Sequence, residues 1–196
     1  MKIALIGTHG TGKTTLAYDL TGELKKRGVN ATMCTEVARR CPLPINRGGS
    51  FRGQLWIVVT QIKEEIEAEK DYDVIVCDRS VLDSYVYTYY IAPKDAEKVW
   101  PVVKEHLKTY DFLFKTPMVD GYMVKDSIRD VDPAFQTDID ALMSRMLAEN
   151  KVPFFELPTE NQLEFIKRKV GLNENACLYD AKNMVCKPKP NAPLRF

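Results

Sequence analysis

Short apolar runs alternate with longer amphipathic segments along most of the chain. Apolar runs typical of strands buried on both faces occur at Lys2–Ile6, Ala31–Thr35, Val74–Cys77, Phe112–Phe114 and Phe154–Leu157. Helical spacing of apolar residues or helix start signals predict helices at Thr14–Arg27, Gln54–Lys70, Val81–Ile91, Asp95–Lys108, Pro133 to about Asn150, and Glu160–Val170. Strands that alternate with helices predict an α/β fold with a parallel sheet of about five strands and helices on both faces.

Segments without this periodicity are expected to be loops or extensions. Cys41–Gly53 contains prolines and glycines and is predicted to be a loop. Residues 1–172 are expected to form one domain, in which the polar stretch at about 116–132 is a small lid, and residues 173–196 a C-terminal tail. Ligands bind beyond the carboxyl ends of parallel strands, so the chemistry is expected directly after the strands.

The residues after the first predicted strand carry a phosphate-binding motif. The octet GTHGTGKT matches G-x-x-x-x-G-K-[ST], the P-loop, and lies between a strand and a helix as that motif requires. Its glycines let backbone N–H groups surround phosphates, Lys13 adds a full charge, and the Thr14 hydroxyl can bind Mg²⁺. The expected nucleotide-binding residues are Gly7, Thr8, His9, Gly10, Thr11, Gly12, Lys13, Thr14 and Thr15. His9 either lines this site or is an exposed loop residue.

Two carboxylates follow the next strands. Asp78 ends an apolar strand, where it can hold Mg²⁺ or accept a hydrogen bond from substrate, and Arg79 beside it can clamp a phosphate. Ser80 is expected to cap the next helix. Glu36 follows another strand and either accepts the proton of an attacking hydroxyl or forms a surface ion pair with Arg39 or Arg40.

One arginine of the irregular segment is a candidate for transition-state stabilisation. Arg129 lies between the fourth predicted strand and Pro133, where a mobile loop can fold over phosphates. The alternative is an exposed, charged loop. We also consider the aromatic residues Trp56, Tyr85, Tyr87 and Tyr89, which either stack on a substrate ring or belong to the core. The stretch Arg47–Gly53 either closes over an anionic substrate or only connects two elements.

Composition limits the kinds of partner and the cellular compartment that we expect for this protein. The 28 Lys and Arg residues nearly balance the 27 Asp and Glu residues, which argues against a long nucleic acid as partner. No apolar stretch is long enough to span a membrane. The five cysteines fit no zinc pattern and favour a reducing, cytoplasmic location, with Cys34 and Cys77 in the core and pairing of Cys177 with Cys186 left open.

Several short motifs resemble those of known kinases. The segment DRSVLDSYVY at Asp78–Tyr87 is similar to the D/E-R-S segment of deoxynucleoside kinases and the D-R segment of thymidylate kinases. The P-loop, Glu36–Arg39, the D-R-S segment and Asp126–Arg129 together resemble the ATPase/kinase-like family that contains ribosylnicotinamide kinase domains. The resemblance covers about residues 1–170 and implies a three-layer P-loop NTPase fold with phosphotransferase activity.

The same resemblance implies roles for individual residues. Glu36 matches the glutamate that acts as base in deoxynucleoside kinases, Arg79 an arginine near the acceptor or the phosphates, and Arg129 a lid arginine. Gln61 lies near the position of a base-reading glutamine. Substrate contacts are thus expected from Glu36, Arg39, Gln61 and Arg79, metal contacts from Thr14 and Asp78, and catalysis from Lys13, Glu36, Asp78, Arg79 and Arg129.

These observations predict a phosphotransferase that uses ATP, or GTP, with Mg²⁺. Its partner is expected to be a small-molecule acceptor that is a nucleoside, a nucleotide or a related compound, and a homodimer is compatible with the sequence. Two alternatives stay open: a polynucleotide-end kinase, and a nucleotide-dependent regulatory module with weak ATPase activity.

Overall fold

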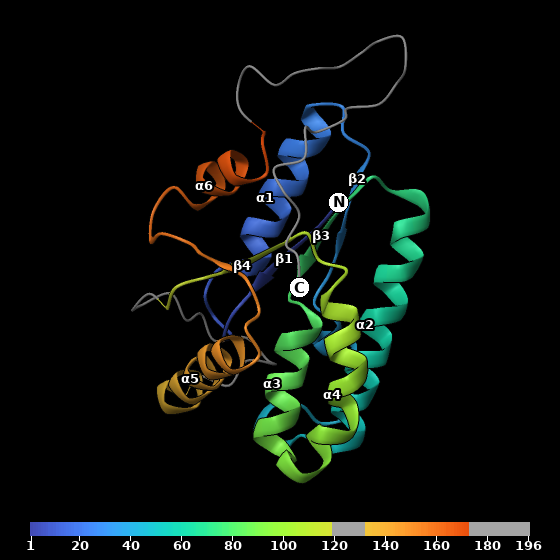
Figure 1. Cartoon of the computed structure of the whole chain (residues 1–196), viewed down its shortest axis with the longest axis vertical. Coiled ribbons are helices and arrows are strands. Elements are labelled where there is room, and N and C mark those ends of the chain that lie inside the picture. Colours follow the sequence, from blue (N-terminus) through green and yellow to red (C-terminus); the bar gives the residue numbers. More distant parts are fainter. Residues whose placement is uncertain (119–131, 173–196) are drawn as a thin grey trace.

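A five-stranded parallel sheet organises the chain (Figure 1). The computed structural model describes residues 1–118 and 132–172. The strands lie in the order β2-β3-β1-β4-β5. The strands are β1 (Lys2–Ile6), β2 (Ala31–Cys34), β3 (Val74–Asp78), β4 (Phe112–Lys115) and β5 (Phe155–Glu156). The helices are α1 (Lys13–Lys26), α2 (Phe51–Asp71), α3 (Val81–Ile91), α4 (Pro93–Leu107), α5 (Pro133–Glu149) and α6 (Gln162–Lys169), with short 3-10 turns at Val37–Arg40 and Asn46–Gly48.

Alternate strand residues build two cores, one on each face of the sheet. Ala4 and Ile6 pack in a cluster with buried side chains of α2, α3, α4 and α5. Ile3 and Leu5, from the same strand, pack in a second cluster with α1 and α6. The three-layer α/β architecture predicted from the sequence is therefore confirmed, and fully apolar strands form because both sheet faces are covered.

The start of α2 corrects the sequence prediction. The helix begins at Phe51, within the stretch predicted to be a loop up to Gly53. Ser50 caps it, because its hydroxyl accepts a hydrogen bond from the backbone N–H of Gly53 at 3.2 Å. Similarly, α4 begins at Pro93, in the joint predicted between two helices, since proline is tolerated at a first helical position.

Most of the predicted lid and all of the predicted tail lie outside the described residues. Arg129 belongs to the undescribed part of the lid, and Cys177 and Cys186 to the tail. In the described ranges, 1–118 and 132–172, no helix is both long enough and apolar enough to cross a membrane.

The sheet brings the predicted site together at one edge. Central strand β1 pairs with β3 and β4, so that Leu5 aligns with Asp78 and Ile6 with Lys115. On the far side of β3, Cys34 aligns with Cys77. The phosphate-binding motif, Glu36 and Arg79 therefore leave the sheet at neighbouring carboxyl ends.

Candidate functional site

The phosphate loop depends on backbone conformations that favour glycine. Gly7 has φ of 130°, and Gly12, which directly precedes α1, has φ of 80°. A Cβ atom on Gly7 would lie 2.9 Å from the Thr116 hydroxyl, so this position also lacks room for a side chain. The loop thus passes closely over the end of β4 and then starts α1, whose N-terminus favours anions.

Lys13 is buried in this loop and turns its ammonium group toward the loop itself. Its Nζ donates to the Thr8 carbonyl and, at 3.0 Å, to the Thr11 hydroxyl. Burial and the positive charge of Arg79 lower the pKa of Lys13 to about 7, although Asp83 and Asp78 act in the opposite direction. A bound phosphate would supply the negative charge that this buried ammonium group needs.

Thr14 and Asp78 meet beside the loop, as the prediction of a shared metal site requires. The Thr14 hydroxyl donates to Asp78 Oδ2 at 2.6 Å. Burial raises the pKa of Asp78, although the Thr14 hydrogen bond and Arg79 act in the opposite direction. A hydroxyl and a carboxylate are hard oxygen donors that fit Mg²⁺, which usually takes few protein ligands beside phosphates and water. Residues 1–118 and 132–172 hold no cluster of three or more His, Cys, Asp or Glu side chains that could bind a metal ion.

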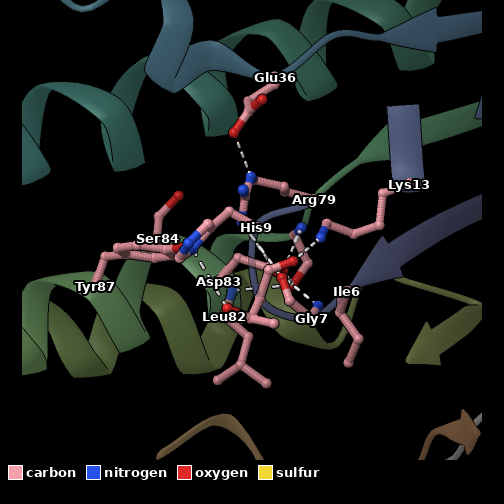
Figure 2. Close-up of polar contacts among 12 residues, drawn as sticks. Ile6, Gly7, His9, Lys13, Glu36, Arg79, Leu82, Asp83, Ser84 and Tyr87 are labelled. Atoms are coloured by element: carbon pink, nitrogen blue, oxygen red, sulfur yellow. Dashed lines mark hydrogen bonds and ion pairs between the residues drawn. The ribbon is translucent and has the colours of Figure 1, made fainter. Parts of the chain in front are cut away.

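Glu36 bridges two arginines at the end of β2. Arg79 Nε donates to Glu36 Oε1 at 2.6 Å and Arg39 Nε donates to Glu36 Oε2 at 2.8 Å (Figure 2 shows the Arg79 pair). Burial alone would raise the pKa of Glu36, but the two arginines outweigh it and lower this pKa to about 2. The ion pair with Arg39 foreseen from the sequence is present, while Arg40 instead binds Glu64.

Arg79 also contacts the phosphate loop. Its Nη1 donates to the Gly7 carbonyl at 3.4 Å, and its side chain is only 12% exposed. The residue has φ of 84°, an uncommon backbone conformation for a side chain of this size, and such conformations cluster at functional sites. The guanidinium group thus lies between the loop and Glu36.

Asp83, which the sequence analysis did not select, ties the loop to α3. Its Oδ1 accepts from the backbone N–H of Gly7 at 3.0 Å, and its Oδ2 accepts from the N–H of Ser80 at 2.8 Å. The Ser80 hydroxyl in turn accepts from Leu82 N, which confirms the predicted cap as a reciprocal capping box. The signal was available, since Ser80 followed by an acidic residue three positions later is a capping-box pattern.

A pocket extends from the phosphate loop along α2 and α3. The space between its walls is about 930 Å³ when the open solvent at its mouth is included. Beyond the loop, it is lined by Glu36, Val37, Ala38, Arg39, Ile45, Asn46, Gln54, Ile57, Gln61, Asp78, Arg79, Asp83, Ser84 and Tyr87. His9 is buried against it, with Nδ1 3.1 Å from the Tyr87 hydroxyl, and the alternative of an exposed His9 was wrong.

Gln61 reaches the pocket, but hydrogen bonds within the protein hold its amide. Its Nε2 donates to Glu65 Oε1 at 3.0 Å and to the Arg79 carbonyl at 3.1 Å, and its Oε1 accepts from Ser84 at 3.0 Å. Both amide protons are therefore used inside the protein. Gln54, two helical turns earlier on the same face of α2, is buried and also lines the pocket. Its spacing of seven residues from Gln61 was the sequence signal that the analysis missed.

Of the aromatic residues considered as substrate contacts, one lines the pocket and the others do not. Tyr87 lines the pocket, whereas Tyr85 packs on Trp100 with ring centroids 4.7 Å apart and Tyr89 lies under Arg145. Trp56 is half-buried and is not among the lining residues.

In the predicted closing loop, Arg47 does not line the pocket. It forms an ion pair with Asp132 and lies over the Phe135 ring.

This fold and site define the class of P-loop proteins that resemble nucleoside kinases, as the sequence motifs led us to expect. A family model described as AAA domain matches residues 2–164, and the chain belongs to this family. No curated protein matches the chain.

Solved structures share the fold. NadR protein in complex with NR gives a TM-score of 0.70 at 18% identity, over 88% of this chain and 52% of NadR. NadR in complex with NAD and AMP-PNP gives a TM-score of 0.67 at 16% identity, over 88% of this chain and 50% of NadR. Deoxyadenosine kinase from M. mycoides with dATP gives 0.61 at 16%, over 86% of this chain and 98% of that kinase. The chain thus spans about half the length of the NadR structures.

Proposed function

We propose that this protein is a kinase that transfers the terminal phosphoryl group of ATP, or GTP, to a nucleoside, a nucleotide or a related small molecule. The observation that carries this proposal is the position of Arg79. Its guanidinium contacts the Gly7 carbonyl in the phosphate loop and, at 2.6 Å, the carboxylate of Glu36. The candidate phosphate cradle and the candidate base are therefore separated by one side chain.

The donor nucleotide would bind at the phosphate loop. The backbone N–H groups of the loop and the N-terminus of α1 would surround its phosphates, and Lys13 would turn its ammonium group from the Thr8 carbonyl to the terminal phosphates. Thr14 and Asp78 would hold Mg²⁺, directly or through water. When bound, Mg²⁺ neutralises part of the phosphate charge.

Glu36 would accept a hydrogen bond from the acceptor hydroxyl and orient it. In the transfer, the hydroxyl oxygen bonds to the terminal phosphorus, the bond from phosphorus to the bridging oxygen breaks, and the hydroxyl proton passes to Glu36. A carboxylate with a pKa of about 2 is a weak base. Its pKa would rise when Arg79 turns toward the transferred phosphoryl group, where the arginine stabilises the developing charge.

The pocket has a lining suited to a ring-containing acceptor. Ile57 and Tyr87 supply apolar surface and Gln54 a polar group. The similar NadR structure is in complex with NR, and a structure of the M. mycoides deoxyadenosine kinase holds its product dCMP. Both ligands support a nucleoside-like or nucleotide-like acceptor for this chain. In the same proposal, residues 1–172 form the catalytic domain and Arg129 acts from the lid.

A phosphoryl-transfer screen tests the proposal. The protein would be incubated with ATP or GTP, Mg²⁺, and a panel of nucleosides, nucleotides and short oligonucleotides, and products identified by mass spectrometry. An acceptor that gains one phosphate with wild type and not with Lys13→Ala is expected. Phosphorylation of oligonucleotides alone would favour the polynucleotide-end kinase, and ATP hydrolysis without any phosphorylated acceptor would favour the regulatory module.

A second variant tests the role of Glu36. Glu36→Gln is expected to lower kcat by roughly 10²- to 10⁴-fold, the usual contribution of a general base, while nucleotide affinity stays within a few-fold of wild type. Glu64→Gln, which alters a carboxylate paired with Arg40, serves as the matched control and should leave kcat unchanged. A Glu36→Gln enzyme with normal kcat would refute the assigned role.

A further inference from the structure

Two cysteines lie side by side near the carboxyl ends of β2 and β3. In the parallel pairing of these strands, Cys34 is aligned with Cys77. Both side chains pack in the same core cluster, so they leave the sheet on the same face. Of the five cysteines, Cys34, Cys41 and Cys77 lie in the described ranges, and all three are free thiols. The chain therefore carries a pair of neighbouring thiols that the proposed phosphoryl transfer does not use.

The spacing of the two strands suits a disulfide. Neighbouring strands lie about 4.8 Å apart. The Cα atoms of two cysteines joined by a disulfide are separated by about 4.4 to 6.8 Å, and this range includes the strand spacing. Burial and the neighbouring Cys34 thiol both raise the pKa of Cys77, which agrees with two thiols that face each other. The two sulfur atoms can therefore bond after side-chain rotation and a small adjustment of the strands.

The two thiols differ in their access to solvent. Cys77 is 1% exposed, whereas Cys34 is half-buried. A small oxidant therefore reaches Cys34 first, and Cys77 then lies beside the oxidised sulfur. An accessible thiol next to a second thiol that can resolve it is the arrangement found in redox-sensing proteins.

We propose that Cys34 and Cys77 are an oxidation site, at which hydrogen peroxide produces a reversible disulfide. The Cys34 sulfur attacks one peroxide oxygen, the O–O bond breaks, and Cys34 becomes a sulfenic acid as one water molecule leaves. The Cys77 sulfur then attacks the Cys34 sulfur, the S–O bond breaks, and a second water molecule leaves with the Cys77 proton. The two thiols together lose two electrons and two protons, and the peroxide is reduced to two water molecules. A thiol reductant reverses the change.

The disulfide would act on the ion pair of the candidate site. Cys34 precedes Glu36 by two residues, and Cys77 precedes Arg79 by two residues. The strand spacing is shorter than the commonest Cα separation across a disulfide, about 5.5 to 6 Å, so the new bond would push the two strand ends apart. Arg79 Nε and Glu36 Oε1, now 2.6 Å apart, would be displaced. This consequence rests on the proposed function, in which a displacement of about 1 Å can slow transfer by up to roughly 10²-fold.

Peptide mapping after oxidation tests the disulfide. Trypsin places Cys34 in residues 28–39, Cys77 in residues 71–79 and Cys41 in residues 41–47. The protein would be treated with hydrogen peroxide, its remaining thiols alkylated, and the digest analysed by mass spectrometry. The expected product links the peptides of Cys34 and Cys77, is lighter than the two reduced peptides by two hydrogen atoms, and disappears with dithiothreitol. A link between the peptides of Cys34 and Cys41, or a Cys34 that stays unlinked, overturns the proposal.

Alanine variants provide the controls. Cys34→Ala and Cys77→Ala should each lose the linked peptide pair. Cys41→Ala should keep it, because the Cys41 thiol lies elsewhere and contacts the Gly53 carbonyl at 3.8 Å.

The rate of phosphoryl transfer tests the effect on the site. After removal of peroxide, oxidised wild type should transfer roughly tenfold more slowly or less, and dithiothreitol should restore the rate, whereas Cys34→Ala should keep its rate after the same treatment. Fully linked protein that transfers as fast as reduced protein overturns the effect on the ion pair. Reduced protein that phosphorylates no acceptor contradicts the proposed function instead, and the peptide map still decides whether the disulfide forms.

Discussion

Replacing Glu65 with glutamine should destabilise the protein strongly, although the two side chains have nearly the same shape. Glu65 is fully buried in α2. Its Oε1 accepts from Gln61 at 3.0 Å and from the Tyr110 hydroxyl at 2.8 Å. Its Oε2 lies 2.8 Å from His106 Nε2 and 3.2 Å from Lys2 Nζ. Each carboxylate oxygen therefore faces two nitrogen or oxygen donors.

A glutamine cannot satisfy this arrangement in either orientation. Its amide NH₂ group must replace one of the two oxygens and then faces two donors. The variant also leaves Lys2 with a single carboxylate partner, Glu69. Removing one partner of a buried ion pair typically costs 3 to 5 kcal/mol, so we expect a loss of about 3 kcal/mol or more in the free energy of unfolding at pH 7.

The expected pH dependence follows from the pKa of Glu65. Burial alone would raise this pKa, but the hydrogen bond from His106 and the charge of Lys2 outweigh burial and lower it below the ordinary value of 4.5. A carboxyl group whose pKa is lowered by folding stabilises the protein above its unfolded pKa, and this contribution is lost as the pH falls through the folded pKa. The difference between wild type and Glu65→Gln should therefore be full at pH 7 and should shrink below pH 4.5.

Urea unfolding at pH 7 and at acidic pH measures both quantities. Glu64→Gln is the matched control on the same helix, because its partner Arg40 has a side chain that is 48% exposed and such pairs contribute at most about 1 kcal/mol. If Glu65→Gln loses no more stability than Glu64→Gln, the reasoning about the buried network is wrong. Loss of the network should also loosen the start of α3, since the Tyr110 hydroxyl accepts from Val81 N at 3.1 Å.

Three further predictions concern the phosphate site. Gly7→Ala should abolish nucleotide binding, because its Cβ would lie 2.9 Å from the Thr116 hydroxyl and because Gly7 has φ of 130°. Gly22→Ala is the control: position 22 has open space around it, so this variant should bind nucleotide normally and unfold at a higher urea concentration than wild type. Nucleotide binding above pH 7 should be accompanied by proton uptake, because the bound phosphates raise the pKa of Lys13 from about 7. Calorimetry in buffers of different ionisation enthalpy measures this uptake, and its absence would contradict the reasoning. Asp78→Asn should raise the Mg²⁺ concentration needed for half-maximal transfer by roughly tenfold, and an unchanged Mg²⁺ requirement would contradict its assigned role.

Strands and the phosphate loop could be predicted from the sequence because their signals are local. Apolar runs mark strands that are covered on both faces, and the octet after Ile6 specifies its own backbone conformation. The start of α2 was harder to predict, since the prolines and glycines that precede it favour a loop and only the Ser50 cap reveals the helix. A cap depends on one hydrogen bond, which a periodicity argument does not detect.

The candidate acceptor side of the pocket could be predicted only in part, because its geometry depends on contacts between distant segments. Glu36 and Arg79 were selected from their positions after strands, and Arg79 Nε lies 2.6 Å from Glu36 Oε1. The sequence could not predict that the Gln61 amide is held by hydrogen bonds within the protein, because its partners, the Arg79 carbonyl and the Ser84 hydroxyl, lie across the α2–α3 interface. Likewise, helical spacing does not tell which tyrosines of α3 reach the pocket, since packing against α4 and α5 decides this.

The two carboxylate oxygens of Asp83 have a mechanical consequence. One oxygen holds the first residue of the phosphate loop and the other holds the start of α3, so a single side chain fixes the separation between the phosphate loop and α3. In-line transfer tolerates little error in that separation. In the proposed reaction, the spacing between donor and acceptor would then be built into the resting protein before either ligand binds.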